Sequence, residues 1–215
     1  MFYFVGLVIL GFALSLMAQI QMGISPIMSV AYTVYSMTEI SLGDATLIWY
    51  TIFIAIEIVI HICLKKYKTI PMDLLQFPLS IVFTRFINLF KAIIPEFKTQ
   101  LNASFGMQLV FLLIAILLTG IGAAMSLDMR VIPNPGDGIV QALADVIHKP
   151  IGLSKNFIDI GCVALSYLLG LAAAHTVYGI GIGTLVSMIL TGRVMAVFNK
   201  CFLKKMLILS GMKTD

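Results

Sequence analysis

Two ionisable side chains within one long apolar run of the chain could move a proton. Glu57 lies near the middle of the run 45–64, and His61 follows four residues later. Residues four apart share one face of a helix, so a carboxylate and an imidazole with this spacing could form a proton relay. Ionisable groups inside runs long enough to cross a membrane are functional candidates by default. The alternative is structural, with Glu57 paired to a buried arginine.

Two arginines stand near the centres of two other apolar runs, Arg85 in 74–94 and Arg193 in 180–200. A guanidinium group binds carboxylate and phosphate groups through two parallel hydrogen bonds, so two arginines at one depth could clamp an anion. We therefore expect both arginines in a shared interior location. Alternatively, Arg193 extends its charge toward the cytoplasm, or the arginines pair with Glu57 and Asp159.

Asp159 is a further candidate for the proton relay. It lies close to one end of the apolar run 156–174, four residues after Lys155. Oppositely charged residues with this spacing form ion pairs on a helix surface. A surface ion pair accounts for Asp159 equally well, and the sequence leaves both interpretations open.

Two shorter apolar pieces, 26–38 and 135–148, begin in the same way, with Ser25-Pro26 and Asn134-Pro135. Serine or asparagine at the N-cap accepts a backbone N–H, and proline at the first helical position has no N–H to leave unpaired. Each piece therefore predicts a short helix that begins at a defined point. The positive end of a helix in a low-dielectric cavity favours a carboxylate or a phosphate.

The start of the second short piece carries additional candidates. Gly136 and Gly138 allow backbone to approach a ligand closely. Asp137 between them either contacts a ligand or serves only to cap the helix. The residues that we predict for a solute site are Ser25, Arg85, Asn134, Gly136, Asp137, Gly138, Thr184 and Arg193.

The composition indicates that these groups are held in a membrane. Of the 215 residues, 60% are hydrophobic and only 11% are charged, whereas soluble domains carry about 25% charged residues. The net charge of +4 does not suggest nucleic acid as a partner. The three cysteines match neither a disulfide framework nor a zinc site. We expect no metal, no cofactor and no enzymatic activity, because no catalytic motif is present.

Six segments are long enough to cross about 30 Å of hydrocarbon. They are 2–22, 45–64, 74–94, 106–126, 156–174 and 180–200. The two shorter pieces are too short to span and suit re-entrant or broken helices. We therefore expect an all-α integral membrane protein with six transmembrane helices and two short re-entrant helices.

The lysines and arginines favour both termini in the cytoplasm. With this orientation the cytoplasmic side carries Lys65, Lys66, Lys68, Arg130, Lys149, Lys155, Lys200, Lys204, Lys205 and Lys213. The opposite side carries only Lys91 and Lys98. If the short pieces also crossed the membrane, the positive charges would be divided far more evenly.

The two halves of the chain share one plan at an offset of 108 to 109 positions. Ser25-Pro26 returns as Asn134-Pro135, Gly43 as Gly152, Arg85 as Arg193 and Phe90 as Phe198. Three spans in each half predict two inverted three-helix repeats, an arrangement typical of alternating-access transporters. We assign residues 1–97 to the first repeat, 98–105 to a linker, 106–203 to the second repeat and 204–215 to a basic cytoplasmic tail.

The second half resembles the YczE/YitT-like bacterial membrane proteins. The resemblance rests on Asn134-Pro135-Gly136-Asp137-Gly138, Gly152-Leu153-Ser154, Asp159, Gly181-Ile182-Gly183-Thr184 and Gly192. It implies a helical bundle in the bacterial inner membrane and supplies no substrate. The first half departs from the pattern at Gln76-Phe77-Pro78 and Asn88, so we expect the second half to carry most ligand contacts.

Three functions fit these observations. The first is a transporter of a small anionic or zwitterionic solute, in which one repeat rocks against the other. The second is an accessory protein that does not transport and positions a partner enzyme in the membrane. The third is the ligand-binding subunit of a multi-component transporter. We expect contacts with membrane lipids and a small-molecule solute, together with a homo-oligomer or a membrane partner protein.

Overall fold

The computed structural model describes residues 2–129 and 131–209. Arg130, Lys213 and residues 210–215 of the predicted tail lie outside the described residues. The helices are α1 (Phe2–Ile20), a 3₁₀ turn (Pro26–Met28), α2 (Ser29–Met37), α3 (Leu42–Cys63), α4 (Ile70–Ile93), α5 (Phe105–Asp128), α6 (Pro135–Ile147), α7 (Ile151–Ala174) and α8 (Ile182–Phe198), followed by a π-helical turn (Asn199–Leu203) and α9 (Lys204–Leu209).

The predicted division into six long and two short helical segments is confirmed. The helices long and apolar enough to cross a membrane are α1, α3, α4, α5, α7 and the stretch Ile182–Leu209. Both ends of the first five lie within five residues of their predicted bounds, and the last begins two residues later than predicted and ends nine residues later. The short helices α2 and α6 begin just after the predicted Ser25-Pro26 and Asn134-Pro135 starts. The protein is therefore a multi-pass helical membrane protein.

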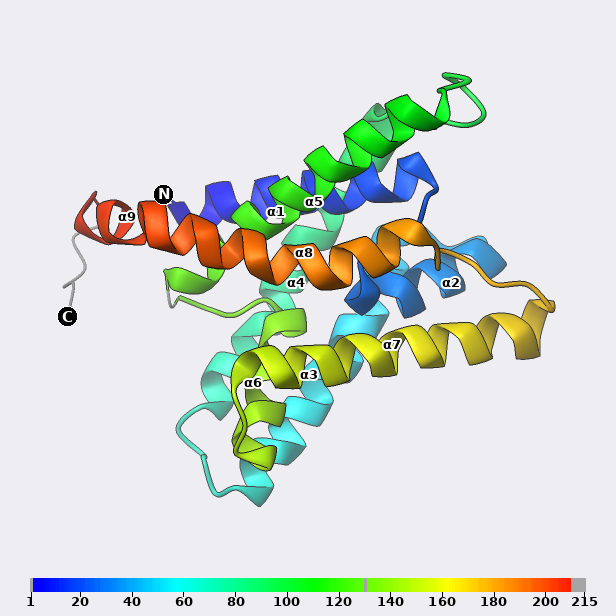
Figure 1. The fold of residues 1–215 in the computed structure, drawn as a ribbon. Coiled ribbons are helices and arrows are strands. Elements are labelled where there is room, and N and C mark those ends of the chain that lie inside the picture. The colour runs from blue at the N-terminus through cyan, green and yellow to red at the C-terminus, as the bar shows by residue number, and fades with distance from the viewer. Residues whose placement is uncertain (1, 130, 210–215) are drawn as a thin grey trace.

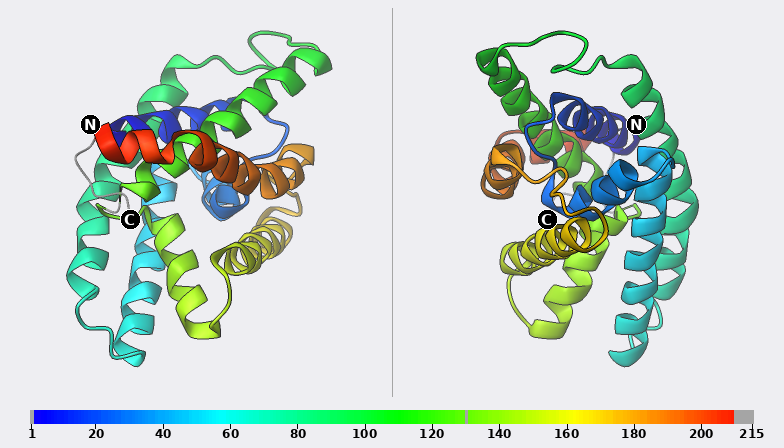
Figure 2. Two further views of the ribbon diagram at one scale, coloured as in Figure 1. Left: turned by 60° about the vertical axis from the view of Figure 1, so that its left-hand side comes forward. Right: turned by 90° about the vertical axis from the view of Figure 1, so that its right-hand side faces the viewer.

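The connections between helices gather toward two opposite sides of the molecule. In Figure 1 the beginning of α1 and helix α9 lie on the left, and the α3–α4 and α6–α7 turns lie toward the lower left. The α4–α5 loop and the α7–α8 connection lie toward the right. Figure 2 shows α3 and α4 side by side and crossing α1 at a steep angle.

The centre of the bundle is the close packing of α1 against α5. A Cβ added at Gly122 would lie 2.7 Å from the Leu10 amide nitrogen and 2.8 Å from the Gly6 carbonyl oxygen. A Cβ at Gly6 would meet α5 backbone at Ser126 at 2.8 Å. Small residues that allow two backbones to approach closely are the usual means of helix association in lipid. These two glycines therefore set the distance between α1 and α5.

The helical hairpins of the two halves differ. α3 and α4 pack along their length, and Gly43 fits against α4, where its amide donates to Asn88 Oδ1 at 2.7 Å. A Cβ at Gly43 would lie 2.3 Å from the Thr84 carbonyl oxygen. α7 and α8 touch only slightly, because α7 packs on α2 and α6 instead. Gly152, the counterpart of Gly43, has nothing within 4 Å of an added Cβ.

The first short helix is tied to α3 by a tryptophan. The Trp49 indole N–H donates to the carbonyl oxygen of Ile27 at 3.0 Å. Ile27 belongs to the 3₁₀ turn that precedes α2. This bond therefore holds the 3₁₀ turn that precedes α2 against the long helix α3.

Replacing Gly122 with alanine tests the α1–α5 contact. The added methyl group meets backbone atoms that cannot rotate away, so we expect a loss of about 1–3 kcal/mol in the free energy of unfolding. The matched control is Gly161→Ala in α7, where an added Cβ has nothing within 4 Å. Thermal unfolding in detergent compares the two variants. Equal melting temperatures would contradict the proposed role of this contact.

Candidate functional site

A small polar pocket lies where the two short helices begin. Its volume is about 40 Å³. Its polar lining is Ser25, Tyr50, Thr119, Asn134, Asp137, Lys155 and Thr191, and its other lining residues include Ile27 and Gly136. A pocket of this volume has room for one or a few water molecules and not for an organic solute. The pocket is therefore closed in this conformation.

The two helix starts contact each other in this pocket. A Cβ added at Gly136 would lie 3.1 Å from the Ile27 side chain, so the glycine lets α6 approach the turn before α2. Ser25 and Asn134 are both buried. The sequence prediction that these two starts belong to one site is thus consistent with their position, although they come from different halves of the chain.

Neither N-cap side chain makes the predicted capping bond. Ser25 and Asn134 occupy the N-cap positions, but no backbone N–H donates to either side chain. The Asn134 Nδ2 instead donates to the Tyr50 hydroxyl at 3.4 Å. The Asn134 carbonyl oxygen accepts from the amides of Asp137 and Gly138 at 2.7 and 2.9 Å, which pairs those donors without the side chain. The side chains of Ser25 and Asn134 therefore line the pocket and do not cap their helices.

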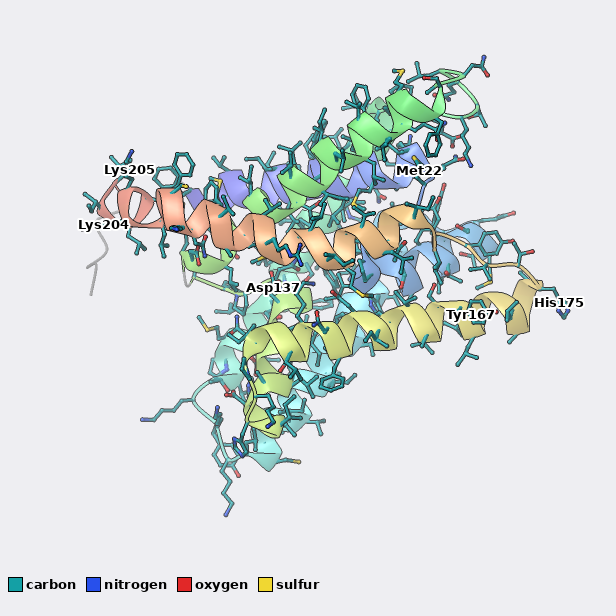
Figure 3. The ribbon with its side chains drawn as sticks, viewed as in Figure 1. Met22, Asp137, Tyr167, His175, Lys204 and Lys205 are labelled. Atoms are coloured by element: carbon teal, nitrogen blue, oxygen red, sulfur yellow. The ribbon has the colours of Figure 1, made fainter. Side chains whose placement is uncertain are left out.

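Charges of both signs reach the pocket. Lys155 Nζ donates to the two carboxylate oxygens of Asp159 at 3.2 and 3.0 Å. The predicted Lys155–Asp159 ion pair is therefore present, but Asp159 is fully buried, so the pair does not lie on the surface as expected. Burial raises the pKa of the Asp137 carboxyl, and the nearby Lys155 ammonium opposes that rise. Figure 3 shows Asp137 between α7 and α8, at a depth between Lys204 and His175.

A second buried polar cluster lies behind the start of α6. Glu57 of α3 is 1% exposed, and the Gln76 Nε2 of α4 donates to its Oε2 at 2.7 Å. A Cβ added at Gly138 would lie 2.6 Å and 2.7 Å from the two Glu57 carboxylate oxygens. Gly138 is therefore required by the close approach of α6 to Glu57, and it does not line the polar pocket.

The two residues of the predicted relay have separate partners. His61 Nδ1 lies 2.6 Å from Asp73 Oδ2, and both groups are buried. Glu57 is bonded to Gln76 instead of to an arginine, so the predicted alternative of a Glu57–arginine pair is wrong. The i, i+4 spacing placed Glu57 and His61 on a buried face of α3, as expected. Their hydrogen bonds lead to two different residues of α4.

The arginines do not meet in the interior, and this prediction is wrong. Arg85 is exposed and forms an ion pair with Asp44 near the start of α3. Arg193 is exposed beside apolar residues of α5 and α8. The sequence shows how far along its helix each arginine lies. It does not show whether the side chain faces the interior of the bundle or its outer surface. Neither arginine lines the polar pocket.

Thr184 lies at a different contact. It is fully buried, its hydroxyl donates to the Gly179 carbonyl oxygen at 3.0 Å, and it accepts from the Gly181 amide at the start of α8. A Cβ added at Gly23 would lie 2.8 Å from the Thr184 hydroxyl oxygen. Thr184 thus holds the segment before α8 against the chain that leaves α1, outside the polar pocket.

The sequence did not point to four polar residues of the pocket, Tyr50, Thr119, Lys155 and Thr191, or to Gln76 of the second cluster. Tyr50 is 1% exposed and lines the pocket, although its place in an apolar run gave no sign of a site residue. Lys155 was counted as a surface charge, and Gln76 was seen only as a departure from a family pattern. A polar group within an apolar run of spanning length is the signal that could have found Gln76.

The comparisons with known proteins identify a family whose function is unknown. No curated protein and no solved structure matches the chain. A family model described as "Family of unknown function (DUF6198)" matches residues 1–200. This match does not test the resemblance to the YczE/YitT-like proteins, which stays a prediction. The match covers nearly the whole chain, and the protein therefore belongs to the DUF6198 family.

Proposed function

We propose that the protein transports a small zwitterionic or anionic solute by alternating access, with the polar pocket as the solute site. The observation that carries this proposal is the meeting of the two helix starts, one from each half, in a single small pocket with both polar and apolar lining. Transporters commonly bind solutes at the midplane, where interrupted helices of two repeats meet. Exposed backbone at such depth is tolerated where protein or a water-filled cavity surrounds it.

Reciprocal contacts support the arrangement of two inverted repeats. α3 packs on α6 of the other half, and α7 packs in the same way on α2. Glu57 lies against Gly138. At the offset of 109 positions, Ser166 corresponds to Glu57 and Ser29 corresponds to Gly138. These two residues are also in contact, because the Ser166 hydroxyl donates to the Ser29 carbonyl oxygen at 3.1 Å. The packing of α1 against α4 in the first half corresponds in the same way to the packing of α5 against α8 in the second half.

The route to the pocket has a wide part and a closed part. A cavity of about 390 Å³ is lined by Gly23, Ile24, Tyr32, Lys98 and the segment 177–181. Two backbone hydrogen bonds lie at its base, from the Ile24 amide to the Gly179 carbonyl and from the Gly183 amide to the Met22 carbonyl, each 2.9 Å long. Ile24 lines this cavity and Ser25 lines the polar pocket, so we propose that breaking these bonds connects the two. This segment is the outer closure in the proposed cycle.

The lining of the pocket indicates the chemistry of the solute. Asp137 offers a carboxyl group, and Lys155 offers an ammonium group already shared with Asp159. Ser25, Tyr50 and Asn134 offer neutral hydrogen-bonding groups. A solute with both a cationic and an anionic group would use all of these partners, so a zwitterion fits better than a simple anion.

The role of Asp137 is tested by replacement with asparagine. We expect ligand-dependent thermal stabilisation of the purified protein, measured with a panel of zwitterionic and anionic metabolites. Asp137→Asn should weaken the apparent affinity by tenfold or more, about 1.4 kcal/mol, because one charged partner is removed. The matched control is Asp145→Asn on the same helix, where the carboxylate is half-exposed and pairs with Lys66.

The same experiment separates the competing functions. Stabilisation that is lost in Asp137→Asn and kept in Asp145→Asn supports a solute site. If the panel produces no shift and solute flux is absent from proteoliposomes, the transporter proposal fails. Stoichiometric cross-linking to a partner enzyme would then favour an accessory protein, and co-purification with an ATPase would favour a ligand-binding subunit.

The proposed orientation is tested by cysteine labelling in intact cells. In a background without Cys63, Cys162 and Cys201, we introduce Lys68→Cys in the α3–α4 turn or Lys98→Cys in the α4–α5 loop. Both positions are exposed. A thiol reagent that does not cross membranes should label Lys98→Cys at once and Lys68→Cys only after permeabilisation. Labelling of both variants before permeabilisation would overturn six crossings with a cytoplasmic α3–α4 turn.

A further inference from the structure

We propose that Glu57 binds a proton in this closed conformation and that its neutral carboxyl group holds the start of α6 against α3. The protonation itself stands on the hydrogen bonding of Glu57, and only its consequence for transport rests on the proposed function. The separate partners of Glu57 and His61 indicate a proton site made by Glu57 and Gln76 in place of a relay along α3.

The hydrogen bonding of the Glu57–Gln76 pair is incomplete by one donor. Gln76 Nε2 donates to Glu57 Oε2, while Glu57 Oε1 and Gln76 Oε1 have no hydrogen-bond partner among residues 2–129 and 131–209. Glu57 is 1% exposed and Gln76 is fully buried. Both unpaired atoms are acceptors, and a buried acceptor without a partner is costly. A carboxylic acid carries one O–H donor that a carboxylate lacks.

One proton therefore completes the pair. We infer that a proton on Glu57 Oε1 provides an O–H donor for Gln76 Oε1, which would give both unpaired oxygens a partner. No charge then remains in the buried cluster at this point. Without the proton, a carboxylate would lie against the Gly138 backbone with a single amide N–H as its donor.

The charged groups of the neighbouring helices favour the neutral form. Several helices around Glu57 carry ionisable groups. They are Asp44, Tyr50, His61 and Cys63 on α3, Asp73, Arg85 and Lys91 on α4, Asp137 and Asp145 on α6, Tyr32 and Tyr35 on α2, and Lys155, Asp159, Cys162 and Tyr167 on α7. The cations on these helices are engaged elsewhere: Arg85 pairs with Asp44, Lys155 pairs with Asp159, and Lys91 lies over the Tyr35 ring. His61 is engaged with Asp73. The nearby charges that act on Glu57 are those of Asp73 and Asp137, which repel a carboxylate.

Loss of the proton would act on the solute pocket through α6. Gly138 follows Asp137 directly, and its backbone lies against both Glu57 oxygens. A carboxylate needs water or additional donors, and neither can enter while Gly138 is in place. Release of the proton to water therefore favours displacement of the start of α6, which carries Asn134, Gly136 and Asp137 in the pocket wall. Protonation closes the pocket and deprotonation opens it.

The proton is detected directly by infrared spectroscopy of the purified protein at neutral pH. We expect a carbonyl band of a neutral carboxylic acid that shifts in D₂O and is absent from Glu57→Gln. The matched control is Glu39→Gln, an exposed glutamate between α2 and α3, which should keep the band. Identical wild-type and Glu57→Gln spectra in this region would overturn the proposal, since Glu57 would then be ionised beside a bound water.

The pH dependence of stability gives a second readout that needs no solute. The folded protein holds a proton that the unfolded chain releases at neutral pH, so wild-type stability should fall as the pH rises. Glu57→Gln keeps a neutral group of the same shape and should lose that part of the slope. An unchanged slope would overturn the proposal. If the infrared band is present and no solute binds, the transport proposal fails alone; if solute binds and the band is absent, this inference fails alone.

Discussion

Backbone N–H and C=O groups within a membrane must find partners inside the protein, and the rest of the structure depends on this constraint. The two short helices begin in the interior, where their first amides and the preceding loops have no lipid partner. The surrounding helices bury these starts, and the loops bond to each other, as Ile24 does to Gly179 and Gly183 to Met22. A chain can place interrupted helices at this depth only if long helices enclose them.

Glycine determines how closely the enclosing helices approach. Gly122 fits against the backbone of α1, and Gly138 fits against the carboxyl group of Glu57. The first contact fixes the centre of the bundle, and the second brings an ionisable group next to the pocket wall. A structural and a functional contact thus depend on the same physical property, the absence of a Cβ atom. The spacing of the glycines in the sequence does not reveal which role each one has.

The sequence predicts the helices well and the side-chain partners poorly. Six apolar runs and two proline starts are local properties, so their positions could be read within a few residues. The sequence pointed to Ser25, Asn134 and Asp137 as pocket residues because the proline after Ser25 and Asn134 marks where each short helix begins. Arg85 and Arg193 were misplaced because the direction of a side chain depends on how its helix is rotated, which only tertiary packing decides. Tyr50 was missed for the same reason, since an aromatic residue suits either an interface or a core.

The single tryptophan of the chain gives this architecture an internal optical probe. Trp49 donates its indole N–H to Ile27, and Ile27 touches Gly136 at the junction of the two helix starts. Indole emission depends on this hydrogen bond and on the polarity around the ring. Separation of the starts would therefore change the fluorescence of the unlabelled protein, and the rate of pocket opening could be followed without an attached dye.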